Sequence, residues 1–229
     1  MDIGSTGQAG PPHRVPRPRA DALRNRERIL VAAREVFVEH GSDAPLDEIA
    51  RRAGVGNATL YRHFPDRKLL VHHVVLYVMD RVADQVETAR AEEPDAFAAL
   101  RRFVHSAADE RIGALCPMLS DGFDREHPEL LAARDRLEGA VERVMAEGRD
   151  AGLLRTDVAV GDLMVALSQL SRPLPGSGCL SFDRYVHRHL QIFLDGLRAP
   201  ARSELPGMAA TLDDLRRSDT TRDARGGSV

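Results

Sequence analysis

The stretch "GVGNATLYRHF", residues 54–64, lies between two segments whose apolar residues recur at helical spacing. Its Gly54-Val55-Gly56 opening could start a phosphate-binding loop, or it could be a sharp turn between helices, because glycine adopts backbone angles that other residues avoid. A dinucleotide-binding loop needs a strand before it and a third glycine where Thr59 stands, and a Walker loop needs Gly-Lys-Ser/Thr. None of these features is present. The GxSxG and HExxH motifs are also absent from the chain, so we expect a turn and no enzymatic activity.

The segments around this turn predict a helix-turn-helix unit. Pro45 suits the first turn of a short helix, whose apolar stripe ends at Gly54. A second short helix is expected over 57–63, because Pro65 prevents it from continuing. Ahead of both, an N-cap at Asp21 and a stop at Gly41 predict a first helix. In such a unit the second short helix enters the major groove of DNA.

The second short helix divides into an anchoring side and an outward side. Leu60 and Phe64, with Val55 ahead of them, can pack against the preceding helices. The outward side carries hydrogen-bonding groups suited to phosphates and base edges, and no carboxylate. Two of its members have other interpretations, since Tyr61 could be half-buried and His63 could be a cap or a core residue. The outward residues are Asn57, Ala58, Thr59, Tyr61, Arg62 and His63.

The run "RERILVAAREVFVEHGSDAPLDEIARRAGVGNATLYRHFPDRKLLVHHVV" resembles the DNA-binding domain of the tetracycline-repressor (TetR) family of bacterial transcriptional regulators. The resemblance rests on the turn, the "TLYRHF" core, and the proline followed by basic residues at the start of the next helix. It implies a homodimeric regulator, most often a repressor, which leaves a palindromic DNA operator when a small molecule binds its C-terminal domain. Activation is the less common mode and stays open.

The resemblance also assigns roles to individual residues. It places Asn57, Ala58 and Tyr61 near base edges, while Thr59, Tyr61, His63 and Arg67 hold phosphates. Arg67 stands where the family usually has lysine, and Pro45 and Leu46 replace a common threonine pair. Further candidates for DNA contact are Arg62, which can pair with guanine, Lys68, and Arg28, whose alternative is a solvated helix face.

The remaining residues also predict helices, and no alternating strand pattern occurs. We therefore expect an all-α fold, in which a long fourth helix runs from Pro65-Asp66 to about Arg90 and joins the DNA-binding domain to a larger helical domain. Further helices are expected near 95–111, 114–122, 128–150, 158–172 and 182–197. The expected divisions are a disordered arm (1–20), the helix-turn-helix domain (21–68), a ligand-binding and dimerisation domain (69–198) and a disordered tail (199–229).

The larger domain holds soft apolar side chains that could line an effector pocket or simply fill a core. The candidates are Met79, Phe97, Phe103, Met118, Phe123 and Met145, with His105, Cys116 and His127 as possible polar additions. Neither His72-His73 nor His187 with His189 has an acidic or cysteine partner at metal-ligand spacing, so we expect no metal and no cofactor. The last two expected helices carry wide apolar stripes that favour a dimer interface. The stripes are Leu163, Ala166, Leu167 and Leu170, and Tyr185, Val186, Leu190, Phe193 and Leu197.

Composition and charge agree with a two-part DNA-binding protein. Of 229 residues, 43% are hydrophobic, enough for a sizeable core, and the two cysteines have no CxxC partner. Residues 1–68 hold twelve Lys/Arg against nine acidic residues, whereas the rest is acidic. Neither a signal peptide nor a membrane span is evident, so a cytoplasmic protein without a membrane partner is expected. The competing class is a helical ligand carrier or interaction module that has lost DNA binding.

Overall fold

The computed structural model describes residues 18–41, 43–110, 124, 126–171, 185–211 and 214. Within these ranges the chain is helical, with no strand and one isolated bridge between Leu154 and Arg198. The expected all-α class is confirmed. None of the described helices is both long enough and apolar enough to cross a bilayer.

The first domain consists of α1 (Pro18–His40), α2 (Leu46–Ala53) and α3 (Asn57–His63), followed by the start of α4 (Arg67–Glu92). Helix α1 begins before Asp21, where the sequence predicted its N-cap, and it ends as expected at Gly41. Asp66 caps α4, because its Oδ1 accepts a hydrogen bond from the backbone N–H of Leu69 at 2.8 Å. The proline-aspartate pair therefore ends one helix and starts the next.

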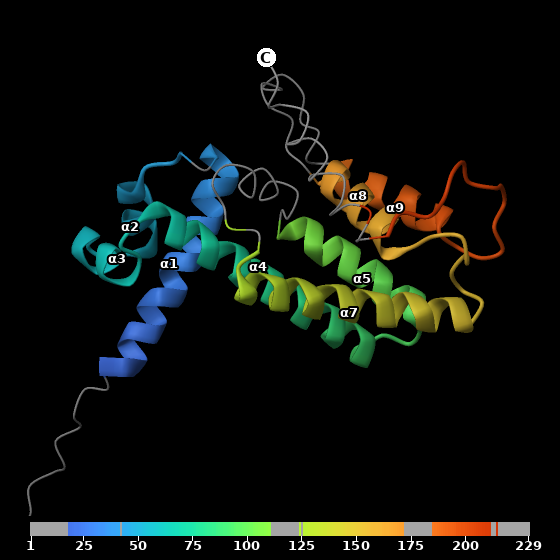
Figure 1. The fold of residues 1–229 in the computed structure, drawn as a ribbon, viewed down its shortest axis with the longest axis horizontal. Helices are drawn as coiled ribbons and strands as arrows, with labels where there is room; N and C mark the ends of the chain where they lie inside the picture. The colour runs from blue at the N-terminus through green and yellow to red at the C-terminus, as the bar shows by residue number, and fades with distance from the viewer. Residues whose placement is uncertain are drawn as a thin grey trace, which may run out of the picture.

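Helix α4 is about 39 Å long and belongs to both parts of the molecule. Its first turns pack on α1, and its remaining length lies along α5 (Ala96–Asp109) and α7 (Pro128–Asp150) (Figure 1). Helices α8 (Val160–Leu170) and α9 (Val186–Gly196) pack on each other and on α5. One continuous hydrophobic core runs from α1 to α9. A displacement of α4 therefore changes the surroundings of both domains.

The bounds of α7 match the prediction of 128–150, whereas α8 and α9 are shorter than expected. Asp95 starts α5 by accepting a hydrogen bond from Ala98 N at 2.8 Å. The helix predicted over 114–122 lies outside the described residues. His127 caps α7, since its Nδ1 accepts a hydrogen bond from the backbone N–H of Glu129 at 3.3 Å.

Residues 199–211 pack against the larger domain, although the sequence predicted a disordered tail from 199 onward. Arg155 Nη2 donates to the Ser203 carbonyl at 2.8 Å, and Asp162 Oδ1 accepts from Ala210 N at 3.1 Å. A Cβ added to Gly161 would lie 2.2 Å from the Ala210 carbonyl oxygen, so only glycine permits this approach. For 199–211 the prediction was wrong because it considered apolar content alone, whereas charged side chains of the folded domain hold this segment; most of 212–229 lies outside the described residues.

Candidate nucleic-acid interface

The turn between α2 and α3 is built on Gly54 and Arg28. Gly54 has a φ of 62°, which is a left-handed conformation that suits glycine. Arg28 Nη2 donates to the Gly54 carbonyl at 3.1 Å, and a Cβ on Gly54 would lie 2.4 Å from the same nitrogen. Arg28, which the sequence offered as a DNA contact, therefore holds the turn against α1. Sequence analysis did not reveal this role, because the two residues are far apart along the chain.

Helix α3 presents the polar surface that the sequence predicted, with two exceptions. Leu60 and Phe64 are buried and anchor it, while Asn57, Ala58, Tyr61 and Arg62 are exposed. Thr59 and His63 are half-buried. The exposed residues line one side of a short helix whose other side is fixed to the core, as a DNA-reading helix requires.

His63 lies closer to the core than an outward position would put it. Its Nε2 atom is buried without a hydrogen-bond partner, and its ring centroid lies 6.3 Å from that of Phe64. Burial, reinforced by the charges of Arg62 and Arg26, lowers the pKa of His63 below its ordinary value. The imidazole is therefore neutral at pH 7 and does not add a positive charge to the surface.

Two acidic side chains of α2, beside α3, are engaged by nearby donors. Asp47 Oδ1 accepts a hydrogen bond from Asn57 Nδ2 at 2.8 Å. Glu48 accepts hydrogen bonds from Arg51 at 2.7 and 2.8 Å and from Arg52 at 3.3 Å. The hydrogen bonds from Arg51 are the main reason that the pKa of Glu48 is lowered. No acidic residue lies within α3 itself. The exposed side of α3 is therefore compatible with the negative charge of DNA.

The start of α4 joins this surface to the rest of the molecule. Lys68 is exposed and Arg67 is half-buried, so the two predicted phosphate-binding cations lie at the N-terminus of α4 just after α3. The guanidinium of Arg26 lies over the Phe64 ring at 5.5 Å, and the His73 ring meets the edge of Phe64 at 5.7 Å. Phe64 thus couples the end of α3 to both α1 and α4.

A second connection between the domains is a buried carboxylate that the sequence did not single out. Glu110, which follows α5, is only 6% exposed. It accepts hydrogen bonds from Arg34 of α1, from Arg81 Nη2 of α4 at 2.8 Å, and from Gln85 Nε2 at 3.3 Å. This group links α1, α4 and α5, because a buried carboxylate must be satisfied by partners from the elements around it.

The residues that were predicted to line an effector pocket occupy different environments in the structure. Phe97, Phe103 and Met145 are fully buried members of the common core, and Met79 is half-buried against it. Met118 and Phe123 lie outside the described residues. The core interpretation, which the sequence left open, fits the three buried residues.

The apolar stripes of α8 and α9, predicted to form a dimer interface, are divided between the protomer's own core and its surface. Leu167 and Leu190 have no exposed surface and belong to the protomer's own core, as do Leu163 and Leu197. The exposed apolar residues of these helices are Val165 (42% exposed) and Ile192 (59% exposed). They line a groove of about 1310 Å³ formed by α8, α9 and the segment after α9. Ala166, Leu170 and Phe193 of the predicted stripes also line this groove, so the packing on the protomer's own core leaves part of each stripe accessible.

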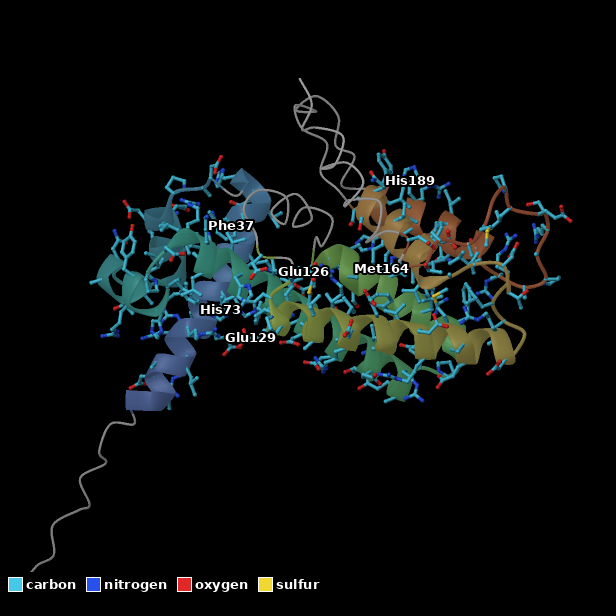
Figure 2. The ribbon with its side chains drawn as sticks, viewed as in Figure 1. Phe37, His73, Glu126, Glu129, Met164 and His189 are labelled. Atoms are coloured by element: carbon cyan, nitrogen blue, oxygen red, sulfur yellow. The ribbon has the colours of Figure 1, made fainter. Side chains whose placement is uncertain are left out.

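One side-chain cluster contradicts the expectation that His72 lacks an acidic partner. His72 of α4, His127 and Glu129 come together across more than fifty residues of sequence, with His72 Nε2 at 3.6 Å from Glu129 Oε2. Figure 2 shows His73 and Glu129 at the junction of the two domains. The expectation was wrong because it considered only partners that lie close to His72 in the sequence.

Comparison with known proteins finds a matching family model for each part of the chain. Residues 29–74 match the family model described as "Bacterial regulatory proteins, tetR family". Residues 94–199 match the model described as "Transcriptional regulator SbtR-like, C-terminal domain". Together the two matches cover the helix-turn-helix domain and most of the larger helical domain.

Relatives of known sequence and structure agree with these matches. The chain is 38% identical over 86 residues to the transcriptional repressor LfrR of Mycolicibacterium smegmatis, a match that spans 38% of this chain and 45% of that protein. A TetR transcriptional regulator of Streptomyces coelicolor is 33% identical in its crystal structure, with a TM-score of 0.60 and coverage of 77% of this chain and 99% of that chain. The LfrR structure in complex with proflavine is 25% identical, with a TM-score of 0.58, and covers 80% and 99% of the two chains.

Proposed function

The chain belongs to the TetR family of bacterial regulatory proteins, and from this premise we propose that it is a homodimeric transcriptional repressor that binds a palindromic operator and is released by a small molecule. The observation that carries the proposal is the exposed side of α3, with Asn57, Tyr61 and Arg62 facing solvent and no acidic residue in the helix. A ligand carrier or interaction module would have no need for such a surface. Repression is inferred from LfrR, which is a transcriptional repressor, and a cytoplasmic location is inferred from an operator as partner.

The proposed homodimer uses the outward side of α8 and α9, where Val165 and Ile192 flank an apolar groove. Exposed apolar surface at helices that are already packed on one side favours a four-helix arrangement of two chains. Two-fold symmetry would place two copies of α3 one DNA turn apart, so the operator should be an inverted repeat.

The proposed effector is a small molecule bound in the C-terminal domain, and a small molecule, proflavine, is bound in the LfrR complex. Of the candidates for its site, Met79 is half-buried on α4, whereas Phe97, Phe103 and Met145 belong to the core around which such a site would form. Binding next to α4 or α5 would act on DNA through α4 and through the Glu110 group, since both reach α1.

Selection of bound sequences from a random DNA pool tests the function. We expect enrichment of one inverted repeat, bound by one dimer, with affinity that falls by about a decade or more between 50 and 200 mM salt, because several phosphates are neutralised. A panel of small aromatic and cationic molecules should include one that releases the DNA. Failure to enrich any sequence, or binding that is independent of salt, would contradict the proposal.

Single substitutions should separate residues that position the protein from residues that read the sequence. Arg67→Ala should weaken binding to every DNA by a similar factor and reduce the salt slope by about one, since a phosphate contact carries no base information. Asn57→Ala or Arg62→Ala should lower affinity for the preferred site by about 1–3 kcal/mol and relax preference at one base pair per half-site. Titrations on the selected operator and on its single-base variants measure both effects. The assignment is wrong if Arg67→Ala alters base preference while the other two changes leave it intact.

A further inference from the structure

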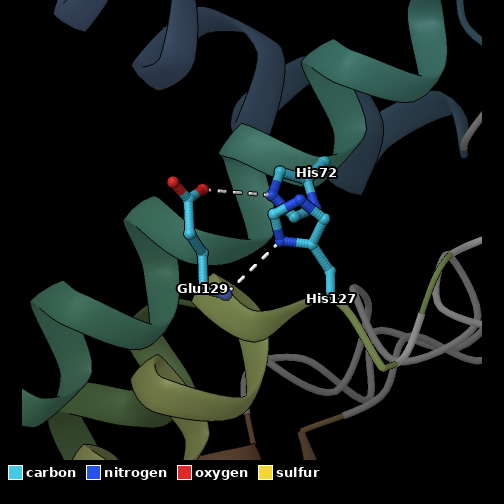
Figure 3. A group of neighbouring side chains, drawn as sticks. All are labelled: His72, His127 and Glu129. Carbon is cyan, nitrogen blue, oxygen red and sulfur yellow. Dashed lines mark hydrogen bonds and ion pairs between the residues drawn. The ribbon is translucent and has the colours of Figure 1, made fainter.

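The side chains of His72, His127 and Glu129 meet where α4 passes the first turn of α7 (Figure 3). One ligand atom from each residue lies within 4.8 Å of the other two. His72 Nε2 is 3.6 Å from Glu129 Oε2, and the two imidazole rings have centroids 4.4 Å apart. Two nitrogen donors and one carboxylate therefore lie near one another between two helices.

This donor set matches the chemistry of a first-row divalent transition metal ion. Such an ion binds imidazole nitrogen and carboxylate oxygen at about 2.0–2.2 Å, so neighbouring ligand atoms of a tetrahedral site lie about 3.4 Å apart. The 3.6 Å between His72 and Glu129 is already close to that value. Mg²⁺ and Ca²⁺ prefer sets made of oxygen alone, whereas imidazole suits Zn²⁺ and Ni²⁺.

The backbone holds two of the three ligands in place, and the third can adjust. The His72 side chain is 13% exposed within α4, and His127 is fixed as the residue that caps α7. The Glu129 side chain is 64% exposed, so it can rotate toward an ion without disturbing the core. Three protein ligands leave the fourth position to water, which can reach the site from the Glu129 side.

The surrounding contacts connect this cluster to the recognition helix. His72 and His73 are adjacent in α4, with ring centroids 5.4 Å apart, and His73 meets Phe64 at 5.7 Å. Phe64 follows the last residue of α3. An ion at the cluster would fasten the beginning of α7 to α4 about one and a half turns after α4 begins.

We propose that His72, His127 and Glu129 bind one divalent transition metal ion, such as Zn²⁺ or Ni²⁺, and that this ion regulates DNA affinity by fixing α4 against α7. The regulatory part rests on the proposed function, whereas the binding part does not. The sequence contained these residues but separated His72 from its partners, so only the packing of α7 on α4 defines the site.

Calorimetric titration of the full-length, tag-free and metal-stripped chain tests the binding part. We expect one equivalent of Zn²⁺ or Ni²⁺ per chain, bound at least about 100-fold more tightly than Mg²⁺. His127→Ser and Glu129→Gln should each weaken Zn²⁺ binding by about tenfold or more. Serine preserves a capping oxygen for α7, and Glu129 is exposed, so both variants should fold normally. Circular dichroism of each variant verifies this.

Two variants provide matched controls. Glu126→Gln removes the same charge three residues before Glu129, and His40→Ser removes an exposed imidazole in the other domain. Both should bind Zn²⁺ within about threefold of the natural chain, since neither residue belongs to the cluster. The site is wrong if the natural chain shows no saturable equivalent, or if the controls lose as much affinity as His127→Ser and Glu129→Gln.

Operator titration with and without one equivalent of Zn²⁺ tests the regulatory part. We expect the affinity for DNA to change by at least about threefold in the natural chain and in Glu126→Gln, and to stay constant in Glu129→Gln. Equal affinities in the natural chain would overturn the coupling. Calorimetry needs no DNA, so failure of the metal site and failure of DNA binding are distinguishable.

Discussion

Replacing Ala58 with aspartate is expected to lower operator affinity at least about 100-fold while the protein stays folded. Ala58 is exposed in the first turn of α3, and α3 contains no acidic residue. A carboxylate there would face the phosphates and base edges of the groove, and juxtaposed like charges lower binding by several kcal/mol. The folded state itself should be unaffected, because a negative charge near a helix N-terminus is favourable.

Ala91→Asp is the matched control for this change. Ala91 is also an exposed helical alanine, but it lies near the far end of α4. Its substitution should alter operator affinity by less than about twofold at moderate salt, since a distant charge is screened. Fluorescence anisotropy with labelled operator measures both variants. Equal losses in the two would mean that net charge, and not the face of α3, governs binding.

Leu190→Asp and Ile192→Asp are expected to have opposite consequences although they lie two residues apart in α9. Leu190 has no exposed surface and belongs to the core, so an unpaired carboxylate there should lower the free energy of unfolding by about 4 kcal/mol or more. Ile192 is 59% exposed beside the groove, so its substitution should leave the protomer folded and separate the dimer. Chemical denaturation and sedimentation velocity measure the two effects.

This pair decides the proposed interface. Dimers of unchanged affinity in Ile192→Asp would show that the outward side of α9 is not where two copies meet. A folded monomer of Leu190→Asp would instead show that Leu190 faces a partner chain. A substitution at Leu190 alone could not have separated the two cases, because unfolding also abolishes the dimer.

The sequence by itself determined the DNA-binding domain. The helices on either side of Gly54, the anchors Leu60 and Phe64, and the end of α3 before Pro65 all follow from local backbone preferences and short-range apolar spacing. Such features depend on residues within a few positions of one another, and sequence displays them directly. The same reasoning gave the bounds of α7 and the all-α class.

Local spacing could not determine which side of a helix faces the core of its own protomer. The apolar stripes of α8 and α9 were visible, but the choice between Leu190 inward and Ile192 outward depends on where α5 lies. His63 was placed outward for the same reason, since the burial of its Nε2 atom depends on how α3 packs on the rest of the domain. A period of 3.6 residues defines a stripe, and only the neighbouring elements define its partner.

Contacts between distant residues were decided by the tertiary structure alone. Arg28 meets Gly54, Glu110 meets Arg34 and Arg81, and His72 meets His127 and Glu129. Each of these contacts joins side chains brought together by the packing of α1, α4, α5 and α7, which no motif in the sequence records. The sequence therefore determined the recognition helix, whereas its connection to the rest of the protein arose from helix packing, because buried polar groups take their partners from whichever element lies against them.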